Sequence, residues 1–289
     1  MSQTGATHAA PTDAPIGVFD SGIGGLTVAH AIGRRLPSER IHYFGDTAHM
    51  PYGERSPALV RRYATRIARH LVDQGCKALV IACNTASANA LDAVRQEVGP
   101  GIPVIDVVEP VVARVAQERL ARIGVIGTRA TVASGLYGRL LRAACASSGV
   151  RAEVMELATP LLAPLIEEGW HHSDRHVIEP IIRGYLERAS FGRLDALVLG
   201  CTHYPLAAKE FAAVLGKDVR IFDAPGAVAD ALAEGLSSAG LLAQKSAADH
   251  LLPSDHRFEV SDLTPTFSDS ARLFFGANLK LEAFDLWTD

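Results

Sequence analysis

The sequence has few cysteines, and their arrangement excludes several classes of protein. Its 289 residues include four cysteines, none of them in a CxxC pair and none at regular spacing. This pattern argues against a disulfide framework and against the paired ligands of a zinc motif. It is typical of reduced thiols, so we expect the protein to work in the cytoplasm.

The chain also lacks long hydrophobic runs and a targeting signal. No apolar run approaches the roughly 18 residues needed to span a bilayer. Residues 1–14 contain neither a basic segment nor an apolar core, so they do not resemble a signal peptide. We expect no membrane partner, and we expect residues 1–14 to form a disordered tail.

An excess of positive charge is missing as well. The formal net charge is −4, which leaves no basic footprint for nucleic acid, so nucleic acid is not an expected partner. A chain of this length predicts about two domains. With 48% hydrophobic residues, such a chain can bury its cores without disulfides or metals.

The most informative feature is a pair of segments that end alike. Residues 77–85 read Lys-Ala-Leu-Val-Ile-Ala-Cys-Asn-Thr, and residues 195–203 read Asp-Ala-Leu-Val-Leu-Gly-Cys-Thr-His. Each is an apolar strand that closes on a cysteine and small polar residues. Ligands bind at the carboxyl ends of parallel strands, so Cys83 and Cys201 are expected to lie in an active site. Cys76 and Cys145 lack polar neighbours of this kind and are interpreted as small buried hydrophobes.

Predicted strands and helices alternate along the chain, which indicates parallel sheets. The first half predicts strands over 16–19, 41–44, 78–82 and 104–107, and helices over 26–36, 57–74 and 86–98, the last capped by Thr85. The pattern restarts at residues 122–128, which resemble residues 15–21. A helix over 132–147 and a strand over 153–155 follow. The remainder predicts helices over 227–242 and 268–275 and a strand over 258–260.

This restart predicts a duplication. We expect an α/β fold of two pseudo-symmetric lobes, each with an open parallel sheet, that face one another across a cleft. Residues 15–108 and 222–289 form the first lobe, which carries Cys83. Residues 109–221 form the second, which carries Cys201.

Two opposed thiols fit one kind of reaction. Inversion of an α-carbon requires a base that removes a proton from one face and an acid that returns one to the other. A thiol whose pKa is tuned by a helix N-terminus or a nearby charge can act in either role.

Four motifs together resemble bacterial glutamate racemases of the aspartate/glutamate racemase superfamily. They are Phe19–Leu26, Gly45-Asp46-Thr47 with Pro51-Tyr52-Gly53, Ala82–Ala88 and Gly200–Leu206. The resemblance runs from about Ile16 to about Phe275. It implies a cofactor-independent, metal-free homodimer that interconverts L- and D-glutamate and supplies D-glutamate for peptidoglycan.

The resemblance also implies roles for individual residues. Cys83 takes the proton from D-glutamate, and Cys201 takes it from L-glutamate. Asp20 assists Cys83, although its carboxylate could instead cap the turn at residues 22–25. His203 assists Cys201 together with Glu167, although Glu168 is an adjacent alternative. The expected substrate contacts are Asp20, Ser21, Tyr52, Gly53, Asn84, Thr85, Thr128, Thr202 and His203.

Other interpretations compete with this one. Residues 22–25 mimic a dinucleotide loop but lack the GxGxxG spacing. Cys83, Cys201 and His203 could ligate zinc, although no second closely spaced ligand pair is present. A two-lobed protein could bind an amino acid without catalysis. An aspartate racemase is the nearest enzymatic alternative, but that family has glutamate at the position of His203.

Overall fold

The structure is a computed structural model that describes residues 11–173, 175–189, 191–244, 255–275 and 279–288. It contains two parallel sheets, one with the strand order β10-β9-β2-β1-β3-β4 and one with the order β6-β5-β7-β8. The run β2-β1-β3-β4 and the second sheet have the same topology, as a duplication predicts. The predicted α/β fold with two parallel-sheet lobes is confirmed.

The central strands of the first sheet are short, apolar and buried on both faces. In chain order its strands are β1 (Ile16–Asp20), β2 (Ile41–Gly45), β3 (Ala78–Ile81), β4 (Val104–Asp106), β9 (Arg257–Val260) and β10 (Leu281–Ala283). One face packs on α2 (Pro57–Asp73) and α3 (Asn84–Val98), the other on α1 (Leu26–Arg35) and α11 (Pro225–Ser238). Residues of β1 alternate between the two cores: Val18 faces α1, and Phe19 faces α2.

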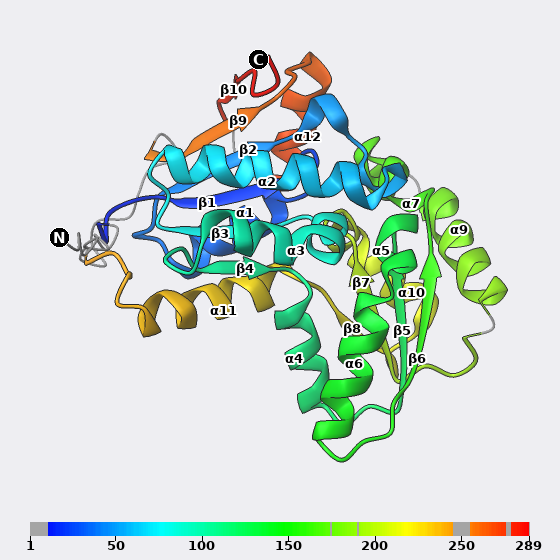
Figure 1. Ribbon diagram of the computed structural model, residues 1–289. Helices are drawn as coiled ribbons and strands as arrows, with labels where there is room; N and C mark the ends of the chain where they lie inside the picture. Colours follow the sequence, from blue (N-terminus) through cyan, green and yellow to red (C-terminus); the bar gives the residue numbers. More distant parts are fainter. Residues whose placement is uncertain (1–10, 174, 190, 245–254, 276–278, 289) are drawn as a thin grey trace.

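The second sheet is also enclosed by helices. Its strands are β5 (Arg122–Gly127), β6 (Glu153–Ala158), β7 (Ala196–Gly200) and β8 (Arg220–Phe222). Its helices are α4 (Glu109–Gln117), α5 (Arg129–Ser134), α6 (Leu136–Ser147), α7 (Leu162–Glu167), α8 (Trp170–Ser173), α9 (Arg175–Arg188) and α10 (Ala208–Leu215). In Figure 1 the strands of this sheet run roughly vertically and those of the first sheet roughly horizontally. Their carboxyl ends converge near α5 and α7.

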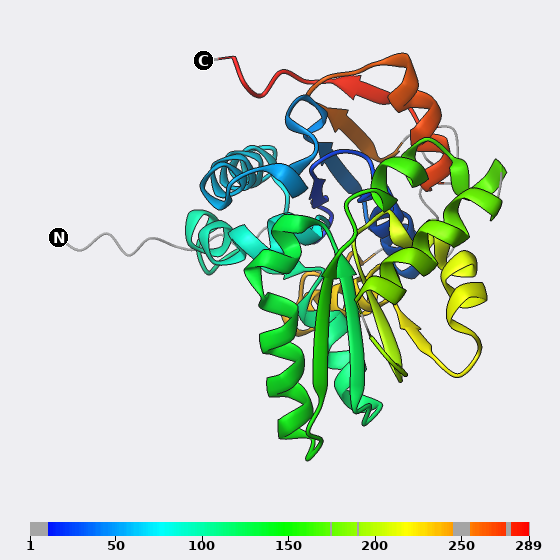
Figure 2. The same ribbon diagram turned by 90° about the vertical axis from the view of Figure 1, so that its right-hand side faces the viewer.

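The C-terminal part of the chain extends the first sheet. β9 pairs in parallel with β2, and β10 pairs with β9, so β2 is not an edge strand. Figure 2 shows this arrangement, with α12 (Pro265–Phe275) beside the added strands. Short 3₁₀ turns, η1 (Thr47–His49), η2 (Tyr52–Glu54) and η3 (Tyr204–Ala207), follow strands near the meeting point of the lobes.

Several local predictions were wrong. The cap of α3 is Cys83, whose Sγ accepts a hydrogen bond from the N–H of Ala86, so Thr85 lies inside the helix. The helix predicted over 132–147 is two helices, because Gly135 adopts a left-handed conformation (φ 61°) that ends α5 and begins α6. α11 ends at Ser238, before the predicted end at residue 242.

The structure describes part of the predicted N-terminal tail and the strands beside the predicted lobe boundary. Residues 1–10 of the predicted disordered tail lie outside the described residues. Residues 11–14 are held in place, because buried Lys77 donates from Nζ to the carbonyl of Thr12 and Ala14 is buried. We propose to keep residues 15–108 with 222–289, and 109–221, as the two lobes. β8 runs to Phe222, one residue past that boundary.

Among the described residues, no helix is both long enough and apolar enough to cross a membrane.

Candidate active site

A cavity of about 230 Å³ lies between the carboxyl ends of the two sheets and brings both cysteines together. Its walls come from both lobes. The lining residues are Ser21, Met50, Pro51, Tyr52, Gly53, Cys83, Asn84, Thr85, Thr128, Ala163, Pro164, Glu167, Cys201, Thr202 and His203. Of the residues predicted from sequence to act on substrate, all line this cavity except Asp20.

Cys83 reaches the cavity because β3 ends immediately before it and α3 begins immediately after it. Its Sγ accepts from the Ala86 N–H at 3.4 Å, and its thiol donates to Ser21 Oγ at 3.6 Å. Burial and the nearby charge of Asp20 raise the pKa of Cys83 to about 12, although its hydrogen bonds with Ala86 and Ser21 oppose this rise. This pKa favours the protonated form of the Cys83 thiol.

Cys201 follows β7 and has different partners. Its Sγ lies 3.6 Å from Nδ1 of His203, and Nε2 of His203 lies 2.5 Å from Oε1 of Glu167. Burial alone would lower the pKa of His203. The charges and hydrogen bonds of Cys201 and Glu167 outweigh burial and raise this pKa well above its usual value.

Glu167, not Glu168, makes the contact with His203. Glu167 ends α7, and its side chain is 25% exposed. Glu168 is exposed at the following position and does not line the cavity.

Asp20 is 1% exposed and lies at the end of β1. Its Oδ2 accepts from the backbone N–H groups of Gly22 (3.2 Å) and Gly25 (3.0 Å), which is the turn-capping role considered above. Its Oδ1 is buried and has no hydrogen-bond partner among the described residues. Oδ1 is therefore the oxygen of Asp20 that is available to accept a hydrogen bond or a proton during the reaction.

Hydroxyl groups from both lobes meet at one end of the cavity. Thr85 Oγ1 lies 2.9 Å from Thr128 Oγ1 and 3.2 Å from Thr131 Oγ1. Thr128 caps α5 by accepting from the N–H of Thr131. Nearby, Asn84 Oδ1 accepts from the hydroxyl of Tyr137 at 2.7 Å. The Asn84 amide nitrogen is buried without a partner in the described structure, so it can donate to a bound anion.

The structure adds supporting residues that sequence reasoning missed. Phe274 of α12 packs edge-on against the ring of His203, with 5.2 Å between ring centroids. Asp46 is fully buried and accepts from the hydroxyl of Tyr52 at 2.6 Å. The Gly45-Asp46-Thr47 motif was a signal for Asp46. The sequence carries no comparable signal for Tyr137 or Phe274, which act from distant parts of the chain.

The group of three potential metal ligands found among the described residues does not include a cysteine. Among the described residues, three potential ligand atoms lie within 4.8 Å of one another in the cluster of His42, His70 and Glu259. Nε2 of His42 lies 2.7 Å and Nε2 of His70 lies 3.1 Å from Glu259 Oε2, while Arg257 lies 2.5 Å from Oε1. These donors satisfy the carboxylate, so the cluster is a hydrogen-bonded network that joins β9 to β2 and α2.

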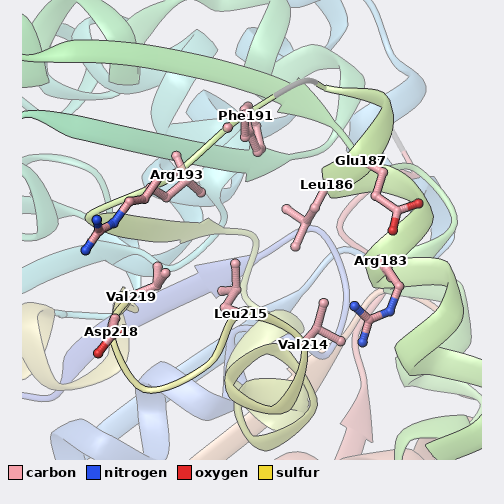
Figure 3. A pocket seen from close by; sticks show the side chains of 11 residues that line it. Arg183, Leu186, Glu187, Phe191, Arg193, Val214, Leu215, Asp218 and Val219 are labelled. Atoms are coloured by element: carbon pink, nitrogen blue, oxygen red, sulfur yellow. The ribbon is translucent and has the colours of Figure 1, made fainter.

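A second cavity, of about 420 Å³, lies between α9 and α10. Figure 3 shows apolar side chains on its walls, among them Leu186 and Val214, with Arg183, Glu187 and Asp218 around them. It contains no cysteine or histidine and none of the predicted site residues. The convergent polar groups lie in the smaller cavity.

Known proteins with related sequences identify the family of this chain. Residues 26–232 match the Asp/Glu/Hydantoin racemase family. A glutamate racemase of Chlorobaculum tepidum is 43% identical over 94% of this chain and 96% of its own length. One of Thermus thermophilus is 47% identical over 79% and 82%, respectively.

Solved structures of glutamate racemases have the same fold as this chain. A glutamate racemase of Francisella tularensis, crystallised with D-glutamate, superposes with a TM-score of 0.85 at 35% identity, covering 96% of this chain and 99% of that one. An aspartate racemase of Picrophilus torridus has a TM-score of 0.54 at 18% identity, which shows a shared fold alone. This chain belongs to the Asp/Glu/hydantoin racemase family and, within it, to the glutamate racemases, which are isomerases.

Proposed function

We propose that this chain interconverts L- and D-glutamate by two-base proton transfer between Cys83 and Cys201. The observation that supports it most is that both thiols line one small cavity, each from a different lobe and each with different polar partners. A volume of about 230 Å³ is below the roughly 300–1,000 Å³ typical of drug-sized ligands and suits a small amino acid.

The two thiols have different polar partners, which favours a different role for each in one direction of the reaction. Cys201, with His203 Nδ1 3.6 Å from its Sγ, is placed to remove the α-proton of L-glutamate. The Cys83 thiol, with a pKa of about 12, is ready to donate to the opposite face. Glu167 stabilises the His203 cation and so acts as a positioning residue for Cys201.

The reverse direction needs the opposite arrangement of protons. Cys83 must lose its proton before it can act on D-glutamate, and the unpartnered Oδ1 of Asp20 is the nearby group that can accept it. The ammonium group of the substrate would lie near Asp20 and would favour the Cys83 thiolate that this transfer leaves.

The carboxylates of glutamate need donors. The hydroxyls of Thr85 and Thr128, the amide of Asn84 and the N-terminal N–H groups of α3 can supply them. Hydrogen bonds to the α-carboxylate strengthen as negative charge builds on it after proton removal, which stabilises the carbanionic intermediate.

Circular dichroism of the purified chain with L-glutamate tests the proposal. After dialysis against a chelator, and without added pyridoxal phosphate, the signal should decay to zero as the racemic mixture forms. Aspartate should react far more slowly. A constant signal with glutamate would contradict the proposal, and a protein that bound glutamate without exchanging its α-proton would support the binding-protein alternative. Recovery of activity only on adding zinc would contradict the thiol mechanism.

We also propose the cellular setting that the family resemblance implies. The product D-glutamate serves peptidoglycan synthesis, and the enzyme works in the cytoplasm as a homodimer. Light scattering of the purified chain gives its mass directly, and the mass of a monomer of 30.7 kDa would contradict the dimer.

A further inference from the structure

The carboxylate of Asp46 joins the active site to the C-terminal part of the chain. Asp46 is fully buried at the end of β2. Its oxygens accept from the hydroxyl of Tyr52 at 2.6 Å, from Oγ of Ser261 at 2.8 Å and from the indole N–H of Trp287 at 3.0 Å. His49 Nδ1 lies 3.0 Å from Oδ1. A buried carboxylate needs such donors, because each lost donor leaves charge unsatisfied.

Tyr52 connects this hydrogen-bond network to the cavity, because it donates to Asp46 and also lines the cavity wall. Tyr52 is 1% exposed and lines the cavity beside Gly53. Gly53 lies against Thr128 of the other lobe so closely that an added Cβ would be 2.7 Å from Thr128 Cβ. The wall formed by residues 51–53 therefore has little freedom to shift without disturbing the contact between the lobes.

Trp287 is anchored on its other side by aromatic packing. Its ring packs edge-on against His49 (4.5 Å between centroids) and Tyr63 (5.2 Å), and the guanidinium of Arg66 lies 5.2 Å from the ring centroid. The backbone N–H of Phe284 donates to the carbonyl of Val260, which fixes the segment that leads to Trp287 onto β9.

We propose that Trp287 is a positioning residue for substrate binding, acting through Asp46 on the cavity wall at Tyr52. This inference rests on the proposed function. The indole N–H holds the Asp46 carboxylate in the orientation in which it accepts from Tyr52. Misplacement of a binding wall by about an ångström is enough to lower catalytic efficiency.

The test is Trp287→Phe, which keeps the aromatic packing and removes the donor. Its KM for glutamate should rise roughly 3- to 10-fold. The indole hydrogen bond has a charged acceptor, and part of the free energy lost with that bond should appear as weaker binding of glutamate. Trp170→Phe is the matched control, because Trp170 is the other tryptophan, is 43% exposed and lies outside the cavity. It should leave KM unchanged.

A purely structural role would lower the melting temperature of Trp287→Phe and leave KM unchanged, which would overturn the proposal. In a Tyr52→Phe background, Trp287→Phe should raise KM little further, because the hydrogen bond between Tyr52 and Asp46 is already absent. Additive effects of the two substitutions on KM would contradict the proposal. If Trp287→Phe does not fold, Ser261→Ala removes another donor to Asp46 and must raise KM by itself. Absence of racemisation by the unmodified chain would instead refute the proposed function.

Discussion

Replacement of Glu167 by Gln tests the charge arrangement at Cys201 most sharply. Oε1 of Glu167 lies 2.5 Å from Nε2 of His203, whose side chain is 8% exposed. Gln keeps the size and one hydrogen-bonding oxygen but removes the negative charge. His203 then loses part of what raises its pKa, so its protonated form beside Cys201 is less favoured.

The size of the effect follows from distance and exposure. Two unit charges about 4 Å apart at an effective dielectric constant of about 20 interact by about 4 kcal/mol. Glu167 is 25% exposed, so water screens part of this interaction, and Gln retains part of the hydrogen bond. A loss of about 1.5–3 kcal/mol remains, which corresponds to an approximately 10- to 100-fold fall in kcat/KM.

Circular dichroism from both enantiomers measures this fall. Enantiomers have equal free energies in solution, so kcat/KM must fall equally in the two directions, which gives an internal check. The raised pKa of His203 favours its protonated form, and activity should be lost as pH rises past that pKa. In Glu167→Gln the alkaline limb should move to lower pH. Glu168→Gln is the matched control and should behave as wild type. Equal effects of the two variants, or an unmoved alkaline limb, would refute the assigned role of Glu167.

Two further predictions concern the thiols and the network at β9. Cys83→Ser and Cys201→Ser should each abolish detectable racemisation, because a serine hydroxyl is far less acidic, while Cys76→Ser and Cys145→Ser should stay within about tenfold of wild type. Near-normal turnover of either site variant would make that cysteine structural. Burial would raise the pKa of Glu259, but hydrogen bonds from His42 and His70 and the charge of Arg257 hold it at about 2. Its stabilising contribution is therefore complete above the unfolded pKa of about 4.3 and is lost as pH falls toward 2. Glu259→Gln should reduce the free energy of unfolding at pH 7 by about 3 kcal/mol in urea melts, whereas exposed Glu282→Gln should leave it unchanged. A wild-type-like melt of Glu259→Gln would show that the network contributes nothing.

The sequence predicted the parts of the fold that depend on local pattern. Apolar runs that alternate with amphipathic segments predicted both parallel sheets, and the position of Cys83 and Cys201 after two such runs predicted where they would meet. The break at Gly135 was missed because its neighbours continue a helical pattern and its left-handed conformation is visible only in three dimensions. Thr85 is a good capping residue, yet α3 begins earlier, where the Cys83 sulfur accepts the capping hydrogen bond.

Contacts between residues far apart in the sequence could not be predicted from local sequence patterns. Trp287 donates to Asp46, and Phe274 packs on His203, although long stretches of chain separate each pair. Nothing local to Trp287 or Phe274 marks them as part of a site. The choice between Glu167 and Glu168 was also open, since both follow the same apolar run and only the orientation of α7 distinguishes them.

Solvent labelling tests the two-base mechanism most directly. When L-glutamate reacts in D₂O, Cys201 should remove the α-proton, and Cys83, already exchanged with solvent, should deliver deuterium to the other face. Mass spectrometry of each enantiomer at less than about a tenth of full conversion should find D-glutamate almost fully deuterated and unreacted L-glutamate largely unlabelled. A single base serving both faces would carry its original proton across. Substantial protium in the early D-glutamate would contradict the assignment of Cys83 and Cys201 as opposed acid and base.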